Sequence, residues 1–187
     1  MSKMTNPAKV ITGKNTVFSY LTVNDPKVPL SGGAPRYRVT RIIPKSDTAT
    51  LDKIRAAIRA AYDEGQSKLR GTSRSVPPLA ELKTPLRDGD QERPGDEAYR
   101  NSYFINASST GKPGVVDVDR NLITDTSELY SGIIGRASIT FYAYNVNGSR
   151  GIACGLNNLQ KLSDGRPLGS RSRPEDDFAD EDDDFLS

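Results

Sequence analysis

The sequence contains no histidine and only one cysteine, Cys154. Without histidine, the Ser-His-Asp and Cys-His pairs that activate nucleophiles are excluded, and so are His-ligated zinc sites. One cysteine can form neither an internal disulfide nor a multi-cysteine zinc site. Chemistry by carboxylates, lysine or tyrosine remains open in principle, but no stretch assembles such residues into a recognisable site. We therefore expect a protein that is not an enzyme and that carries no metal and no cofactor.

Long apolar runs are also absent. No stretch approaches the roughly 20 residues of a membrane-spanning helix, and the N-terminus lacks the apolar segment of a signal peptide. The expected location is the cytoplasm, without membrane attachment. Only 35% of the 187 residues are hydrophobic, a low share for a wholly globular chain, so part of the chain is expected to be solvated.

Charge is distributed unevenly along the chain. Residues 175–187 contain eight of the 24 acids and none of the 26 bases, so residues 1–174 carry a formal charge of +10. A basic body joined to an acidic tail indicates two different partners, or one partner and an internal competitor for its site. We predict a flexible arm (1–9), one folded domain (10–162), and a linker with a disordered acidic tail (163–187).

The clearest structural pattern lies in residues 136–156. From 136 to 146, apolar residues alternate with polar or aromatic ones, which is the period of a strand with two unlike faces. Phe141 and its neighbours on one face can pack in a core, whereas Tyr142 and Tyr144 lie on the other. Asn147-Gly148 follows and favours a type I′ turn, because both central residues of that turn need a positive φ. We predict a long hairpin with exposed rings on one face.

Two further strands are predicted at residues 16–23 and 36–43. In the first, the valines and the leucine are expected to face the core, which leaves Phe18 and Tyr20 on the opposite face. In the second, Arg36 and Arg38 share one face. Because a core cannot take these two arginines, they are expected to contact either carboxylates or phosphates.

One helix is predicted at residues 50–64, where apolar residues recur at helical spacing and Gly65 is placed to end it. It is expected to pack on a sheet with its charged face in water. Residues 66–101 contain many turn residues and little periodicity, so whether they are ordered is left open.

Rings and cations on one sheet surface are typical of proteins that bind single-stranded nucleic acid. Unpaired bases stack on exposed rings while Lys and Arg contact phosphates, so such binding tolerates any sequence. The candidate DNA-binding residues are Lys14, Phe18, Tyr20, Arg36, Arg38, Arg41, Arg136, Tyr142, Tyr144 and Arg150.

The acidic tail can act as a tethered competitor of DNA. When a strand displaces it from the basic surface, its apolar residues become available to partner proteins. The predicted partner-binding residues are Asp182, Asp183, Asp184, Phe185 and Leu186. The alternative interpretation is a tail that only increases solubility.

Six stretches carry a family resemblance: KTPLRDGD (83–90), SYFINA (102–107), KPGVVD (112–117), YSG (130–132), FYAYN (141–145) and GIACGLNN (151–158). They resemble the phage single-stranded-DNA-binding proteins of the Enc34 type, which are distantly akin to the T7-type phage single-strand binders. The resemblance covers roughly residues 8–178. It implies a mainly β OB-fold, a small Greek-key barrel with one packed helix, that binds single-stranded DNA without base preference in phage replication or recombination. It also implies that the tail engages replication or recombination proteins of phage or host.

Other interpretations remain open at this point. A phage structural or scaffolding protein would use the tail and loops for assembly. A surface that contacts only the nucleic-acid backbone could also take RNA, or duplex DNA more weakly. Both a monomer and a homodimer are compatible with the sequence.

Overall fold

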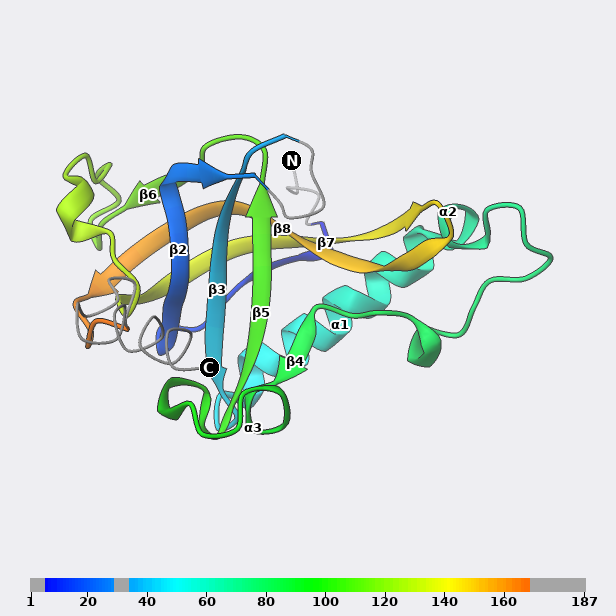
Figure 1. Ribbon diagram of the computed structural model, residues 1–187, viewed down its shortest axis with the longest axis horizontal. Helices are drawn as coiled ribbons and strands as arrows, with labels where there is room; N and C mark the ends of the chain where they lie inside the picture. The colour runs from blue at the N-terminus through cyan, green and yellow to red at the C-terminus, as the bar shows by residue number, and fades with distance from the viewer. Residues whose placement is uncertain (1–5, 29–33, 169–187) are drawn as a thin grey trace, which may run out of the picture.

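The strands of this protein form a barrel to which one long helix is attached (Figure 1). The structure is a computed structural model that describes residues 6–28 and 34–168, and within these it leaves out the side chains of residues 20–25 and 27. The strands are β1 (Lys9–Ile11), β2 (Thr16–Lys27), β3 (Arg36–Pro44), β4 (Leu86–Asp88), β5 (Ser102–Ser109), β6 (Gly114–Val116), β7 (Ile134–Val146) and β8 (Ser149–Ser163). The helices are α1 (Thr48–Glu64), α2 (Gln66–Arg70) and α3 (Gly89–Glu92), with single 3-10 turns η1 (Leu79–Glu81), η2 (Glu97–Tyr99) and η3 (Thr126–Glu128).

Five of the described strands close the barrel. β7 pairs with β2, β2 with β3, and β3 with β5, all antiparallel. β5 then pairs in parallel with β8 at Ser108 and Gly155, and β8 returns antiparallel to β7 along almost its whole length. β1, β4 and β6 extend this barrel from β7, β5 and β8. The arrangement is an OB-fold, which confirms the predicted fold class.

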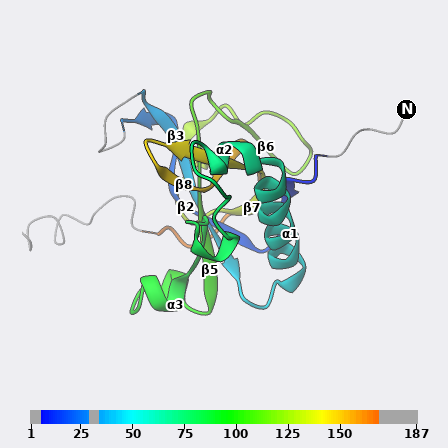
Figure 2. The same ribbon diagram turned by 90° about the vertical axis from the view of Figure 1, so that its right-hand side faces the viewer.

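α1 packs on the apolar face of the β7–β8 hairpin. Phe141 and Ala143 of β7 are buried and share one core with Ile54 of α1. The helix begins after Asp47, whose side chain accepts a hydrogen bond from the Thr50 amide at 3.2 Å. The hairpin extends past the barrel along α1, and α2 lies across its end (Figures 1 and 2). The predicted helix is confirmed, with its start two residues earlier.

The folded body begins earlier than predicted. Ala8 is buried, and Lys9 opens β1, which pairs with β7. The expectation of a flexible arm through residue 9 is therefore wrong for Ala8 and Lys9, because the short apolar stretch around Val10 pairs with the edge of β7. Residues 1–5 lie outside the described residues.

A second apolar cluster covers part of the outer face of the barrel, at the Ile42 end of β3. Ile42 of β3 and Phe104 of β5 are buried there with Tyr99, whose ring meets that of Phe104 edge to face at 5.1 Å between centroids. Leu168, the last described residue, packs against this cluster, and its amide donates a hydrogen bond to the Ser131 carbonyl at 2.8 Å. Around Val17 and Ile42, β2 and β3 are therefore covered on both of their faces. The predicted acidic tail lies beyond Leu168, outside the described residues.

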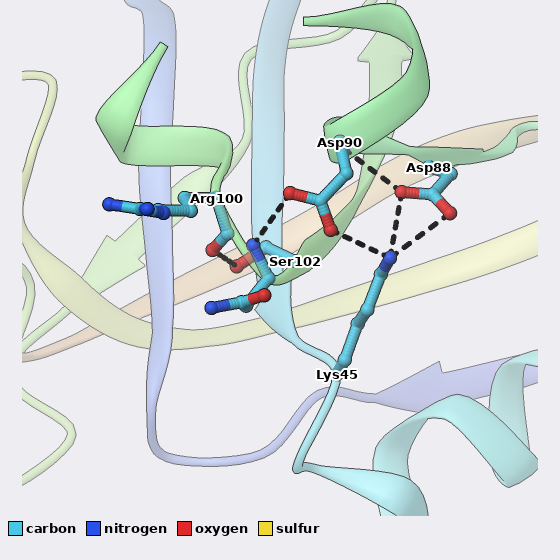
Figure 3. A network of polar contacts seen from close by, with 6 residues as sticks. Lys45, Asp88, Asp90, Arg100 and Ser102 are labelled. Carbon is cyan, nitrogen blue, oxygen red and sulfur yellow. Dashed lines mark hydrogen bonds and ion pairs between the residues drawn. The ribbon is translucent and has the colours of Figure 1, made fainter. Parts of the chain in front are cut away.

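The chain between α2 and β5 is ordered, although its sequence has little periodicity. Lys45, which follows β3, forms ion pairs with Asp88 and Asp90 at 2.9 and 2.8 Å (Figure 3). Asp90 also accepts a hydrogen bond from the Asn101 amide at 3.0 Å. The hydrogen bond between Lys45 and Asp90 lowers the pKa of Asp90 and raises the pKa of Lys45. This network fastens α3 to the ends of β3 and β5.

Candidate nucleic-acid interface

The outer face of β7 presents two tyrosine rings. Inward and outward residues alternate strictly along the middle of this strand, so that Phe141 and Ala143 are buried while Tyr142 is 42% exposed and Tyr144 is half-buried. Asn147 and Gly148 form the hairpin turn with φ of 52° and 84°. Both the predicted turn and the predicted orientation of the two rings are confirmed.

Small residues on β8 let the two rings lie close to that strand and leave a trough over Ala153, which lines an open groove together with both rings. Tyr144 is paired across the hairpin with Gly151, and Tyr142 with Ala153. A Cβ atom on Gly151 would come within 2.8 Å of the Tyr144 hydroxyl, and one on Gly155 would lie 3.6 Å from the Tyr142 ring. A larger side chain at Gly151 would therefore displace the Tyr144 ring and the Lys83 carbonyl, whose oxygen would lie 2.5 Å from the added Cβ. At Gly155 a Cβ atom would make only ordinary contact with the Tyr142 ring. The sequence signal for the trough was the alternation of small residues from 151 to 155, which sequence reasoning overlooked.

Polar and cationic side chains form the opposite wall. Arg36 of β3 donates a hydrogen bond to the Ser108 hydroxyl of β5 at 3.1 Å. Lys83 is held beside β8 because its carbonyl accepts a hydrogen bond from the Ile152 amide at 2.8 Å. Together the two walls enclose an open groove of about 350 Å³. Its lining is Arg36, Lys83, Thr84, Pro85, Arg87, Asn106, Ser108, Tyr142, Tyr144, Ile152, Ala153 and Cys154.

The groove carries positive charge that is only partly neutralised. None of its lining residues is acidic. Arg36 bonds a neutral hydroxyl, and Arg87 is paired with Glu92 only at 3.8 Å on the exposed surface. Exposed ion pairs of this kind neutralise little, so the groove attracts anions.

The groove has no reactive group at its base. Burial raises the pKa of the Cys154 thiol well above its ordinary value, so the sulfur stays protonated and is a poor nucleophile and metal ligand. Over residues 6–28 and 34–168, no group of three or more His, Cys, Asp or Glu side chains is placed to hold a metal ion. In the same ranges no helix is long and apolar enough to cross a membrane.

Three of the predicted site residues meet in the groove, namely Arg36, Tyr142 and Tyr144. Two others lie close to it. Arg38 is exposed on the same strand and the same face as Arg36. Arg150 lies beside the hairpin turn, where it donates a hydrogen bond to the Ser73 hydroxyl at 2.7 Å.

Three predicted residues lie elsewhere or outside the description. Lys14 is exposed in the turn between β1 and β2. Arg136 shares the outer face of β7 with Tyr142 but lies about 20 Å further along the extended strand, where it donates a hydrogen bond to the Thr12 carbonyl at 3.4 Å. Tyr20 belongs to β2, but its side chain is outside the described part of the chain, as are residues 182–186 of the tail.

Two predicted residues are inside the barrel. Phe18 and Arg41 are both fully buried and paired in register across β2 and β3, so the expectation that they face a ligand is wrong. The alternation along β2 predicted that the valines face the core and that Phe18 faces outward. The assignment failed because both faces of β2 are covered here, and Val17 packs into the outer cluster instead of the barrel core. A fully buried arginine in the barrel was not foreseen.

Sequence reasoning also missed the residues that β4 and β5 supply. Lys83, Arg87, Asn106 and Ser108 all line the groove. They reach it because β4 pairs with β5 while Lys83 bridges to β8, and both contacts are long-range pairings in a segment without periodic pattern.

Comparison with known proteins places the fold among phage proteins. A family model described as "Enterobacter phage Enc34, ssDNA-binding protein" matches residues 8–186. A protein named p50, from Acyrthosiphon pisum secondary endosymbiont phage 1, is 28% identical over 158 residues, which are 81% of this chain and 82% of that protein.

Two solved structures share the fold. The single-stranded DNA-binding protein from bacteriophage Enc34, in complex with single-stranded DNA, aligns with a TM-score of 0.73 and 21% identity over 90% of this chain and 97% of that chain. The single-stranded DNA binding protein gp2.5 of bacteriophage T7 aligns with a TM-score of 0.59 and 18% identity over 92% of this chain and 93% of that chain. With the family model matching nearly the whole sequence, the chain belongs to the family of the Enterobacter phage Enc34 single-stranded-DNA-binding protein.

Proposed function

We propose that this protein binds single-stranded DNA without sequence preference during phage DNA replication and recombination in the cytoplasm of the host. The observation that carries the proposal is the position of Tyr142 and Tyr144 beside a groove that contains cations and no acid. OB-folds bind oligonucleotides on the face of their second and third strands and at the adjoining loops. Here those strands are β3 and β5, and the β7–β8 hairpin adjoins them. The family to which the chain belongs and the complex of the Enc34 protein with single-stranded DNA support the same ligand.

In this proposal the two walls of the groove have different tasks. Tyr142 and Tyr144 stack on unpaired bases, and each stacked base contributes roughly 1–3 kcal/mol. Arg36 and Lys83 contact the phosphates. The trough over Ala153 gives the base room to lie against a ring.

The proposed contacts account for the lack of sequence preference. Every base has a π face, so stacking does not distinguish sequences, and phosphates carry no sequence information. In a duplex the base faces are covered by their neighbours, which leaves only phosphate contacts. Duplex DNA is therefore expected to bind more weakly.

The groove offers no catalytic role in this scheme. It is lined by no carboxylate, and burial keeps its one thiol protonated by raising the thiol pKa. We therefore propose a binding protein that holds the strand without chemical change.

We further propose that the acidic tail competes with DNA and recruits replication or recombination proteins. Leu168 packs against the cluster that contains Ile42 of β3, and the six residues of β3 from Ile42 to Arg36 span about 20 Å. The 19 residues after Leu168 reach at most about 65 Å when extended, so their carboxylates can meet the cations of the groove. DNA that displaces them would free Phe185 and Leu186 for a partner.

Fluorescence titration with a labelled dT oligonucleotide at two salt concentrations tests the main proposal. Binding of the labelled oligonucleotide should weaken steeply with salt through counterion release. Unlabelled poly-dT should compete for the protein more effectively than poly-U or duplex DNA. Sedimentation with and without the oligonucleotide tests the scaffolding alternative. A protein that self-associates and ignores the oligonucleotide would contradict the proposal and support that alternative.

A further inference from the structure

The segment that follows α1 is fastened to the end of the β7–β8 hairpin. The Asn145 side chain donates a hydrogen bond to the Lys68 carbonyl at 3.0 Å, and Arg150 donates one to the Ser73 hydroxyl at 2.7 Å. Leu69, between these points, is fully buried in the main core. α2 and the loop after it therefore have a fixed position beside the end of the groove.

Two more hydrogen bonds hold the rest of this segment in place, up to the point where it reaches the groove. The Tyr62 hydroxyl donates a hydrogen bond to the Pro77 carbonyl at 2.8 Å. The Lys83 carbonyl then accepts one from the Ile152 amide at 2.8 Å, and the Lys83 side chain lines the groove. Residues 66–83 thus form a bracket that runs from the hairpin end back to the groove.

The bracket is strongly cationic and not neutralised. Its cations, Lys68, Arg70, Arg74 and Lys83, are all exposed, and its one acid is Glu81. None of the four cations forms an ion pair with an acid in the described ranges. On α1, by contrast, Arg55 and Arg59 are paired with acids one turn away.

We infer that Lys68, Arg70 and Arg74 form a phosphate-binding extension of the groove, which holds the DNA strand where it passes the end of the hairpin beyond Tyr144. This inference rests on the proposed function. Residues 66–75 contain no aromatic side chain, so the extension recognises the backbone and not the bases. The extension lengthens the binding site and makes the affinity for DNA more dependent on salt. Base stacking remains confined to the rings of β7.

The geometry favours a continuing strand as the occupant. Lys83 belongs to both the groove and the bracket, so the cations of the groove and those of the bracket adjoin at this residue. A single strand longer than the groove must leave it at one of its ends, and a row of cations follows a backbone in proteins of this type. The extension should therefore matter for long oligonucleotides and not for short ones.

The test compares two triple variants of the full chain. One is Lys68→Gln with Arg70→Gln and Arg74→Gln, and the matched control is Lys53→Gln with Arg55→Gln and Arg59→Gln, which removes the same charge from the exposed face of α1. Affinity for dT5 and dT20 is measured as a function of salt. With about 0.7 counterions released per phosphate contact on a single strand, the bracket variant should lose about 2 from the log–log salt slope on dT20 and bind dT20 roughly 10- to 100-fold more weakly at 0.1 M salt. It should bind dT5 within about twofold of wild type, and the control should match wild type on both.

A third variant, Lys68→Arg with Arg70→Lys and Arg74→Lys, keeps the charge and should behave like wild type, because a phosphate contact of this kind needs charge more than geometry. Equal losses on dT5 and dT20, or a bracket variant that behaves like the control, would overturn the extension. If the bracket variant behaves like the control but binding by the wild-type protein still depends on Tyr142, the extension is wrong and the proposed function is still supported. A wild-type chain that binds neither oligonucleotide would instead refute the proposed function itself.

Discussion

The guanidinium carbon of Arg41 lies 3.7 Å from the centroid of the Phe18 ring, and both side chains are fully buried inside the barrel. One guanidinium nitrogen of Arg41 donates to the Thr12 hydroxyl at 3.1 Å and to the Gly135 carbonyl at 2.7 Å. Its other two nitrogens have no hydrogen-bond partner among the described residues. Burial lowers the pKa of Arg41, yet an arginine keeps its charge in proteins. The barrel therefore holds a charge that is compensated by two hydrogen bonds from one nitrogen and by the face of a ring.

This arrangement predicts that Arg41→Met leaves the protein at least as stable as wild type. A buried charge loses several kcal/mol of hydration, whereas a desolvated cation–π contact returns about 2 kcal/mol. The Thr12 hydroxyl and the Gly135 carbonyl also keep other donors, the Ala137 amide and the Thr16 hydroxyl. Urea unfolding should show a free energy of unfolding equal to wild type or higher by about 1–3 kcal/mol, with unchanged dT affinity. If the folded Arg41→Met variant bound dT more weakly than wild type, Arg41 would have to contribute to the DNA-binding surface.

Ala153→Ile tests the trough. The added side chain should occupy the space in front of Tyr142 without altering any charge, and a β-branched residue suits an open strand surface. We expect at least a tenfold loss of dT affinity, because about 1.4 kcal/mol of stacking is a factor of ten and each base contributes that much or more. Ala56→Ile, at an exposed position of α1, is the matched control and should bind dT normally. Equal affinities of the two variants would show that no base lies over Ala153.

Removal of residues 175–187 should tighten DNA binding. The deletion removes eight carboxylates from the competitor, and the gain should be greatest at low salt, where charges are least screened. Titration of the full and shortened chains with dT20 at two salt concentrations measures the effect. Unchanged affinity at low salt would contradict the competitor role.

The Lys45 network should make the segment around α3 sensitive to acid. Because Lys45 lowers the pKa of Asp90 in the folded protein, the contribution of this carboxylate to stability is present above its unfolded pKa, about 4. It is lost as the pH falls through the lower folded value. Amide exchange at Asn101, whose N–H bonds to Asp90, should accelerate relative to the barrel strands below about pH 4. In the Lys45→Met variant this acid-dependent acceleration at Asn101 should be smaller. If wild type and Lys45→Met responded identically to acid, Lys45 would not be the cause of the lowered pKa of Asp90.

The sequence was most informative where the two faces of a strand differ. Along β7 one face is apolar and the other polar, so the alternation correctly placed Tyr142 and Tyr144 outside and Phe141 inside. Asn147 and Gly148 identified the turn because few residues adopt positive φ. The barrel itself was expected from the family resemblance.

The sequence was uninformative where tertiary contacts decide. Along β2 both faces are covered, so alternation could not identify the inner face, and Phe18 was assigned to the wrong side. Arg87 reaches the groove through the pairing of β4 with β5, and Lys83 reaches it through a bridge to Gly151 of β8. No local pattern encodes such a pairing, and it therefore appeared only in the structure.

The central claim is that the rings of β7 stack on unpaired bases, and replacing Tyr142 and Tyr144 by alanine tests it most directly. Affinities of the double variant for dT20 and for duplex DNA should be measured under identical salt, with Tyr142→Phe as the control that keeps a ring. We predict a loss of roughly 2–6 kcal/mol for dT20, little change for duplex DNA, and near wild-type affinity for Tyr142→Phe. Equal losses on single-stranded and duplex DNA, or no loss on either, would contradict the claim.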